Sequence, residues 1–572
     1  MASGPLQILP APSGFARFKY EPLKAFSTKP SIRLAVLEPG TRESNIRITL
    51  VTKAFAERPK YEALSYAWGR PNAVRNIELN GTRVQVRMNL WSALVHLRSD
   101  TEGRALWIDA ICINQTDLEE RNEQVQLMAY IYSRAKKVLV WLGVIVIFDS
   151  EPHKEKTQEE LEKIARSEIY TLTQRPYWWR VWIVQEIGSA MSLEIHWGTT
   201  LELDPTAKFI SRFESWERFF KRIPLEDEHQ NAAVTLARQR EGRHGDNFLL
   251  ANLMVACQRS ECEEPRDKVY GFVGIAHDCE DGSFPVDYSK SLFELYDDVI
   301  RFHCRSQEGS ETVVYFSEVV QRLFGGPISM QQDLNRHTVN SGSDLISYHP
   351  KKVDVRAKYH GTISLVGPSY DEFIALPEAT RKWKIALSMN DWSSLSHKEF
   401  LQRLRRKNEV LMGLLHDLDA PSLAKMTTIQ RRLYWDSNPA LDNVSLRESE
   451  AMGFWHPRQF SQMAESDYIF LEETEDEPRL FSTSNGVIGL MPPQARPGDI
   501  LFQFAKSSII AVVRCRDYEN YGHGDINARL IGRALVPPEV SEESGNFYVQ
   551  STQNQWPTTI VMDLRLLQLL TE

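Results

Sequence analysis

Short apolar runs alternate with helical periodicity through residues 61–200, and this alternation is the clearest pattern in the chain. Runs typical of buried strands occupy residues 61–66, 105–109, 138–142 and 192–198. Between them, apolar residues recur at the spacing of amphipathic helices over 89–98, 117–135 and 177–190. Such alternation predicts an α/β fold with a parallel sheet and helices on both faces. A ligand in such a sheet lies beyond the carboxyl ends of the strands.

Two local signals define turns and helix ends. Asn80-Gly81 separates two alternating stretches and predicts a hairpin over 76–86, because both residues accept the positive φ angles of a two-residue turn. Asp117 and Glu120 have the spacing of a capping box and predict the start of a helix that continues to about Ala135.

The pattern outside this block divides the chain into further parts. Residues 1–54 carry one or two strands, and 55–200 form the predicted α/β domain. The later parts are a helical region at 201–325, a polar linker or long loop at 326–360, a second helical region at 361–467, and a small β-rich unit at 468–572.

Composition narrows the class of protein. The 572 residues include 42% apolar and 10% aromatic residues, which is enough to build packed cores. The net charge of −9 gives no global case for nucleic acid as a partner. The longest apolar run, Val138 to Phe148, is about half of the ~20 residues that span a bilayer, and the N-terminus lacks the basic start of a secretory signal. We therefore expect a soluble cytoplasmic protein without a membrane span.

Several motifs of common enzymes are missing from the sequence. We find no phosphate-binding loop, no dinucleotide-binding glycine motif, no zinc-protease helix motif and no hydrolase nucleophile elbow. Cys257 and Cys262 lie five residues apart, but no second cysteine or histidine pair follows at the spacing of a zinc site. The six scattered cysteines also give no disulfide framework. We therefore expect neither a metal nor a resident cofactor.

Four segments in order resemble the fungal heterokaryon incompatibility (HET) domain. They are YEALSYAWG (61–69), NLWSALVHLR (89–98), the stretch 106–143 that begins LWIDAICINQ, and RPYWWRVWIVQEI (175–187). PRDKVYGFVGIA (265–276) and GVIGLMPPQARPGDI (486–500) resemble segments that accompany this domain. The resemblance implies a role in non-self recognition and in programmed cell death when genetically different hyphae fuse.

The same domain resembles a divergent TIR domain, which implies a flavodoxin-like sheet. Ser65-Tyr66 resembles the end of the first TIR strand, and Ile108-Asp109 resembles the end of the second. Trp182 and Glu186 match the Trp-x-x-x-Glu of TIR enzymes that split NAD. This chain departs from TIR domains by the stretch between Asp149 and Gln174, which TIR domains do not usually carry.

The resemblance gives each matched residue an expected role. Glu186 is the candidate catalytic carboxylate, and Trp182, Ser65, Tyr66 and Asp109 are candidate NAD-binding residues. Residues four apart on a helix share a face, so Trp182 and Glu186 would face one crevice. The indole can stack on the cationic nicotinamide ring, and the carboxylate can stabilise the positive charge that develops on the ribose.

A structural alternative stands beside each role. Trp182 and Glu186 are equally explained as a core aromatic and a solvated carboxylate. Asp109 either holds a ribose hydroxyl or accepts N–H groups of its own loop.

Other residues of the predicted domain favour structural roles. Glu120 fits the capping box, and Cys112 fits an inert buried thiol. The remaining candidates for structural roles are Glu119 and Glu123 on the solvated face of the helix, Asn114 and Gln115 in the loop, and the ion-pair turn Arg266-Asp267-Lys268.

Two functions from different classes follow. The first is an NAD glycohydrolase that works when the domain self-associates. The second is a non-enzymatic interaction module that signals through oligomerisation with an unidentified incompatibility partner.

Overall fold

The computed structural model forms two compact units, Met1–Lys290 and Ser291–Glu572. The structure describes residues 6–7, 18–23, 30–147, 157, 167–201, 210–220, 232–241, 248–280, 282–326, 332–333, 352–389, 443–447, 477–483, 486–515, 526–536 and 558–571. Within the described residues, no helix is both long enough and apolar enough to cross a membrane.

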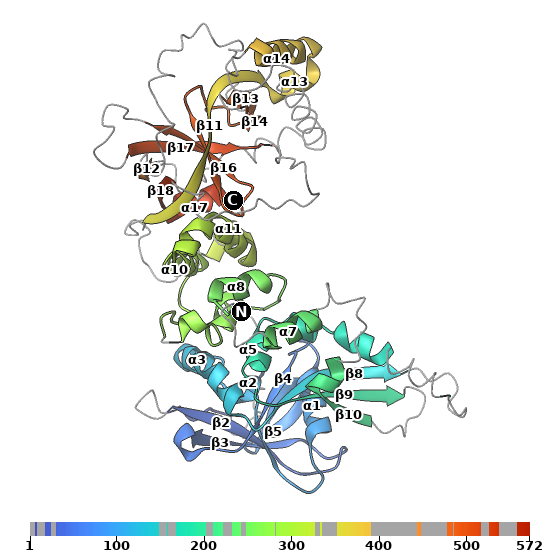
Figure 1. Ribbon diagram of the computed structural model, residues 1–572. Coiled ribbons are helices and arrows are strands. Elements are labelled where there is room, and N and C mark those ends of the chain that lie inside the picture. The colour runs from blue at the N-terminus through green and yellow to red at the C-terminus, as the bar shows by residue number, and fades with distance from the viewer. Residues whose placement is uncertain are drawn as a thin grey trace. The chain divides into compact units, whose positions relative to one another are not determined.

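The first unit is built on a ten-stranded mixed sheet (Figure 1). From edge to edge its strands are β1 (Leu6–Gln7), β6 (Thr82–Arg87), β5 (Val74–Leu79), β3 (Arg47–Ala54), β2 (Ser31–Leu37), β7 (Arg104–Trp107), β4 (Glu62–Tyr66), β8 (Val138–Ile147), β9 (Leu193–Leu201) and β10 (Ile210–Ser215). The fold is thus α/β as predicted, but the sheet is mixed, whereas a purely parallel one was expected. The predicted flavodoxin-like strand order is not confirmed for the sheet as a whole.

Most of the parallel pairing lies in the middle of the sheet, and one further short parallel pairing joins β3 to β5. Strands β7, β4, β8 and β9 run parallel to one another, and their order along the chain is second, first, third, fourth. The chain passes from β4 to β7 on one side and then to β8 on the other side of β4. The direction of the strand connections therefore reverses at β4. Antiparallel strands flank this group because β2 pairs with both β3 and β7, and β10 returns along β9. Strands from residues 1–54 thus belong to the same sheet.

The helices of the first unit that precede residue 190 connect its strands, and the later ones follow its last strand, β10. They are α1 (Met88–Leu97), α2 (Asp109–Cys112), α3 (Leu118–Arg134), α5 (Trp182–Gly188), α6 (Trp216–Phe220), α7 (Ala232–Glu241), α8 (Leu250–Ala256) and α9 (Asp267–Val273), with 3-10 turns η1 (Phe55–Glu57), η2 (Pro176–Trp179) and η4 (His277–Cys279). The predicted hairpin forms as expected, since Asn80 and Gly81 have φ angles of 47° and 74° between β5 and β6.

The second unit begins with two helices and continues into an antiparallel sheet. The helices are α10 (Leu292–His303) and α11 (Gln307–Leu323), followed later by α13 (Tyr370–Ala375), α14 (Pro377–Met389) and α17 (Leu564–Thr571). The strands are β11 (Lys352–Ser369), β12 (Asn443–Arg447), β13 (Arg479–Thr483), β14 (Ile488–Met491), β15 (Ile500–Phe504), β16 (Ile510–Cys515), β17 (Ile526–Ala534) and β18 (Thr558–Asp563).

Strand β11 organises this sheet. Its first half pairs with β18, its middle with β15 and its last part with β13. Six strands, β11, β15, β16, β17, β12 and β18, therefore close into a ring. The sequence predicts a linker or long loop at 326–360, but residues 352–360 are strand. Most of that linker and residues 390–442 of the second helical region lie outside the described residues.

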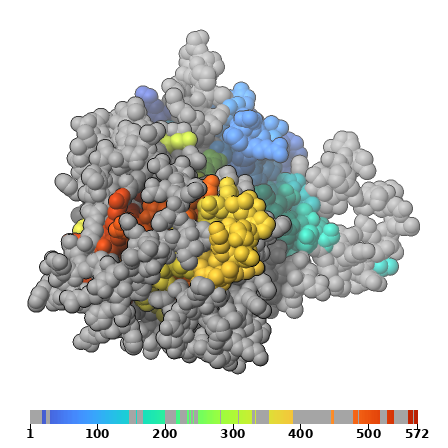
Figure 2. Space-filling view, turned by 90° about the horizontal axis from the view of Figure 1, so that it is seen from above, coloured from blue at the N-terminus to red at the C-terminus, as the bar shows by residue number. Residues whose placement is uncertain are grey.

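In the region predicted as helical at 361–467, helices α13 and α14 follow β11, but residues 361–369 are the end of β11 and residues 443–447 are β12, so these two stretches are strand instead of helix. Helices α13 and α14 form the yellow surface in Figure 2. Trp383 of α14 is fully buried against apolar residues of β13 and β14, while Ile374, Leu376 and Ile385 are exposed.

Candidate functional site

The carboxyl ends of the central parallel strands carry the polar residues that the sequence singled out. Ser65 and Tyr66 end β4, and Asp109 follows β7 at the start of α2. All three are buried, and Ser65 is fully inaccessible to solvent. These positions lie at the reversal point of the parallel strands, where doubly wound sheets hold their ligands.

Glu186 reaches the end of β4 from helix α5. The residue is 1% exposed, and the Ser65 hydroxyl donates a hydrogen bond to its carboxylate. The Ser65 and Tyr177 hydroxyl oxygens are 2.6 Å apart. Arg180 places a guanidinium nitrogen 3.5 Å from the other carboxylate oxygen of Glu186. The buried Glu186 carboxylate therefore contacts the Ser65 hydroxyl and the Arg180 guanidinium.

The electrostatics of this group bring the titration of the Glu186 carboxyl close to neutral pH. Burial raises the pKa of Glu186 to about 7, with the Asp109 charge adding to the shift and Arg180 opposing it. Burial also raises the pKa of Asp109, again against Arg180. The Arg180 guanidinium thus interacts electrostatically with two buried carboxylates, those of Glu186 and Asp109. A carboxylate that titrates near pH 7 can accept a proton or stabilise a developing cation.

Asp109 is held by its own surroundings. The indole nitrogen of Trp68 donates to its carboxylate at 2.8 Å, and the backbone N–H of Ala110 donates at 2.7 Å. Hydrogen bonding from Tyr66 favours its ionised form. The Gln115 amide donates to the Asp109 carbonyl at 3.2 Å. The contact of Gln115 fits its predicted role in bracing the loop.

Trp182 shares helix α5 with Glu186 but has a different polar partner. Its indole nitrogen donates to Asp267, the first residue of α9, at 2.9 Å. The ring is partly exposed. The structure thus gathers Ser65, Tyr66, Asp109 and Glu186 around Arg180, and it ties the edge of the Trp182 ring to α9.

Sequence reasoning missed Arg180 and Tyr177. Both lie in or beside the 3-10 turn η2, which ends before α5 begins, so neither has helical spacing to Glu186. The only available signal was their place in the string RPYWWR, just before the matched Trp-x-x-x-Glu.

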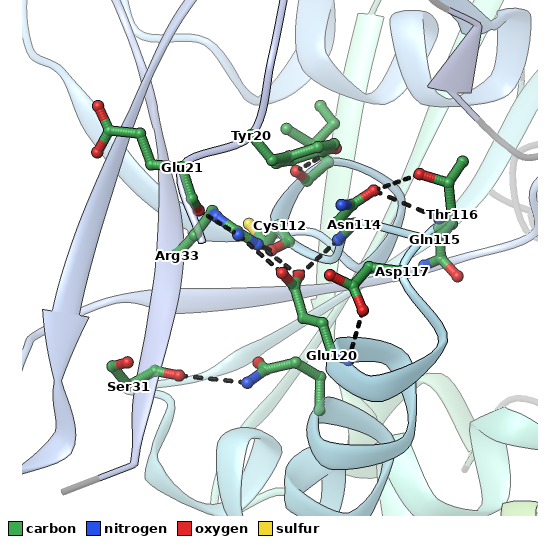
Figure 3. A network of polar contacts seen from close by, with 12 residues as sticks. Tyr20, Glu21, Ser31, Arg33, Cys112, Asn114, Gln115, Thr116, Asp117 and Glu120 are labelled. Atoms are coloured by element: carbon green, nitrogen blue, oxygen red, sulfur yellow. Dashed lines mark hydrogen bonds and ion pairs between the residues drawn. The ribbon is translucent and has the colours of Figure 1, made fainter. Parts of the chain in front are cut away.

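Glu120 belongs to a separate buried network, drawn in Figure 3. Both of its carboxylate oxygens bind the Arg33 guanidinium, at 2.5 and 2.8 Å, and one accepts the Asn114 N–H at 2.7 Å. Asp117 does cap α3, since its side chain accepts the Glu120 N–H at 3.1 Å. The second half of the predicted capping box is replaced by an ion pair that ties β2 to α3.

The described residues contain no group of three or more His, Cys, Asp or Glu side chains arranged to hold a metal ion. All six cysteines are free thiols. Cys112 is fully buried, and burial raises its pKa to about 12, so its thiol stays protonated and unreactive.

Comparison with known proteins matches part of the first unit. Residues 61–186 match the family model of the heterokaryon incompatibility protein (HET). The chain is 35% identical over 165 residues to "Heterokaryon incompatibility protein 6, OR allele" of Neurospora crassa. That match covers 26% of this chain and 24% of the relative, so the chain aligns with about a quarter of the relative's length. No solved structure matches.

Proposed function

Because residues 61–186 match the HET family model, we propose that this chain acts in heterokaryon incompatibility, as an effector of non-self recognition that promotes cell death. The family match and the name of the relative support the proposal. Self-association through the HET domain and an incompatibility partner of unknown identity are part of it.

We further propose that the HET domain is TIR-like and hydrolyses the N-glycosidic bond of NAD. The observation that carries this proposal is Glu186, a buried carboxylate with a pKa of about 7 at the reversal point of the parallel strands. The order of the parallel strands supports it too, because that order is shared with flavodoxin-like sheets.

In this proposal Glu186 is the catalytic group. Its ionised carboxylate stabilises the positive charge that builds up on the ribose as the bond from C1′ to the nicotinamide nitrogen breaks. The electron pair of that bond leaves with nicotinamide, which departs as a neutral base. Water adds to C1′ and releases one proton, giving ADP-ribose.

The neighbouring residues have supporting roles. Ser65 donates to Glu186 and holds its carboxylate in one orientation. Asp109 and Tyr66 hold the ribose hydroxyls, and the Trp182 ring stacks on the nicotinamide while its N–H is held by Asp267. Since Glu186 is 1% exposed, NAD enters only when the residues that cover the cluster move apart.

The test is nicotinamide release by the purified full chain with NAD. We expect release by the wild type and a loss of at least a hundredfold in Glu186→Gln, which keeps the side-chain volume but removes the charge. The matched control is Glu119→Gln, an exposed carboxylate on α3, which should leave release unchanged. Equal release by wild type and Glu186→Gln would refute the assignment of Glu186.

A non-enzymatic interaction module is the second candidate, and one observation favours it. The Glu186 carboxylate is enclosed and already bound by Ser65 and Arg180, which is the arrangement of a structural cross-link between β4 and α5. Under this alternative, the folded Glu186→Gln chain still triggers incompatibility in cells and the wild type releases no nicotinamide.

A further inference from the structure

Helix α5 carries Glu186, but few interactions within the helix itself stabilise it. It has only seven residues, and its N-cap residue, Val181, makes no capping hydrogen bond through its side chain. Short helices depend on tertiary contacts for their stability. Whatever fixes α5 therefore also fixes the Glu186 carboxylate.

Asp267 is the polar group that meets the first turn of α5. Its carboxylate is buried and accepts the Trp182 N–H at 2.9 Å on one oxygen and the Tyr288 hydroxyl at 2.6 Å on the other. The guanidinium of Arg121, from α3, lies 3.9 Å from the oxygen that binds Tyr288 and 3.8 Å from the centre of the Tyr288 ring. Three separate segments thus converge on one carboxylate.

The chain just before α9 also holds the backbone that leads into α5. The Val181 N–H donates to the Glu261 carbonyl at 3.0 Å, and the Glu261 N–H donates to the Trp179 carbonyl. Glu263, two residues on, binds Arg87 at 2.9 Å, and Arg87 in turn donates to the Gly69 carbonyl beyond β4. Residues 261–267 therefore bind the backbone before α5 directly and reach the segment after β4 through Arg87.

Trp182 links Asp267 to Glu186 because the two α5 residues are one helical turn apart. The hydrogen bond to Asp267 sets the plane of the indole ring and the direction in which α5 starts. Displacement of a reacting group by about 1 Å can cost roughly a hundredfold in rate. The position of Glu186 opposite Ser65 thus depends on a residue outside 61–186.

We propose that Asp267 is a positioning residue for Glu186, acting through Trp182 and helix α5. The inference rests on the proposed hydrolase for its kinetic consequence, but its structural part can be tested alone. Under this proposal, one residue that the candidate site depends on, Asp267, lies in the segment that follows the matched residues 61–186.

The first test measures hydrogen exchange in the full chain. We expect Asp267→Ala and Trp182→Phe to raise the exchange rates of α5 amides at least tenfold, with β4 and β8 amides unchanged. Asp267→Asn should restore part of the protection, because its amide oxygen can still accept the Trp182 N–H. Glu280→Gln, an exposed carboxylate in the same unit, is the matched control.

The second test separates binding from catalysis. Trp182→Phe keeps a ring for stacking but loses the N–H, so we expect kcat to fall at least tenfold while KM changes less than threefold. The double variant of Asp267→Ala and Trp182→Phe should be no worse than the poorer single variant, since both remove the same contact.

Each outcome decides a different point. Unchanged α5 exchange in both single variants would overturn the positioning role, as would a rise in KM with kcat intact. If Asp267→Ala does not fold, Trp182→Phe carries the test. If the wild type releases no nicotinamide while α5 exchange still rises, the hydrolase fails and the control of α5 by Asp267 stands.

Discussion

Glu186 shows how one buried side chain couples stability to pH. Its pKa is about 7 in the folded chain against an ordinary value of 4.5, because burial disfavours its charge. Between pH 4.5 and about 7, the Glu186 carboxyl is ionised in the unfolded chain but still protonated in the folded chain. The folded state is therefore favoured below pH 4.5, and this contribution is lost as the pH rises through about 7.

The variant Glu186→Gln cannot ionise and should lose this dependence. From pH 4.5 to 7 the free energy of unfolding of the wild type should fall, relative to the variant, by up to about 1.4 kcal/mol per pH unit. Denaturant unfolding at several pH values measures the difference. Asp267 adds a slope of the same sign, since burial raises its pKa to about 6, but that slope is common to both chains. Parallel curves would contradict the assigned pKa of Glu186.

Arg33 and Glu120 form a further buried charge pair in the first unit, with side chains 3% and 7% exposed. Removing one partner leaves an unpaired charge in the core. We expect Arg33→Met to lower the free energy of unfolding by about 3 kcal/mol and a second change, Glu120→Leu, to recover most of it. Urea unfolding of both variants measures this. A double variant that is less stable than Arg33→Met would show that the pair itself stabilises the fold.

At the scale of elements, the β5–β6 hairpin depends on its turn. Gly81 has a φ of 74° and no atoms near the place of an added Cβ, so a substitution there meets only backbone strain. Gly81→Ala should therefore lower the free energy of unfolding by about 1–2 kcal/mol. Gly103→Ala is the matched control, because Gly103 lacks a positive φ and has only ordinary contacts. Equal losses in thermal melts of both variants would contradict this explanation.

Elements that depend on neighbouring residues could be predicted from the sequence, whereas those that depend on distant ones could not. The Asn80-Gly81 turn and the Asp117 cap are local and formed as expected. The attachment of the antiparallel flank to the parallel strands was missed, because the pairing of β2 with β7 joins residues about seventy positions apart.

The same distinction holds for the site. Four of the five candidate residues meet at the strand ends, which the alternation of strands and helices predicted. Arg180 was missed because the backbone between it and Glu186 is only partly helical. The partner of Trp182 lies 85 residues away, in a turn that the sequence favoured only as structural.

At the scale of the whole molecule, the last described helix is tied to the start of its own unit. Ser317 of α11 lies 2.7 Å from the Thr571 hydroxyl oxygen of α17, and Gln321 donates to the Gln568 carbonyl at 3.1 Å. Tyr296 of α10 extends this buried network, with its hydroxyl 2.7 Å from Ser317. All of these partners belong to the second unit.

Thr571→Val keeps the shape of the side chain but removes the hydroxyl. We expect the second unit to lose about 1–2 kcal/mol of stability, because Ser317 loses a buried partner. Hydrogen exchange of α10, α11 and α17 should increase, while that of β4, β7 and β8 in the first unit stays the same. An equal increase in both units would show that they unfold together.

The closed ring of the second unit also constrains how the protein can be made in the cell. Lys352 of β11 pairs with Asp563 of β18, so the ring cannot close until the ribosome has added about two hundred further residues. Until then the unpaired edge of β11 is available to other nascent chains. The first unit, whose strands come earlier, can finish folding during that interval, so misassembly on the ribosome should begin at β11.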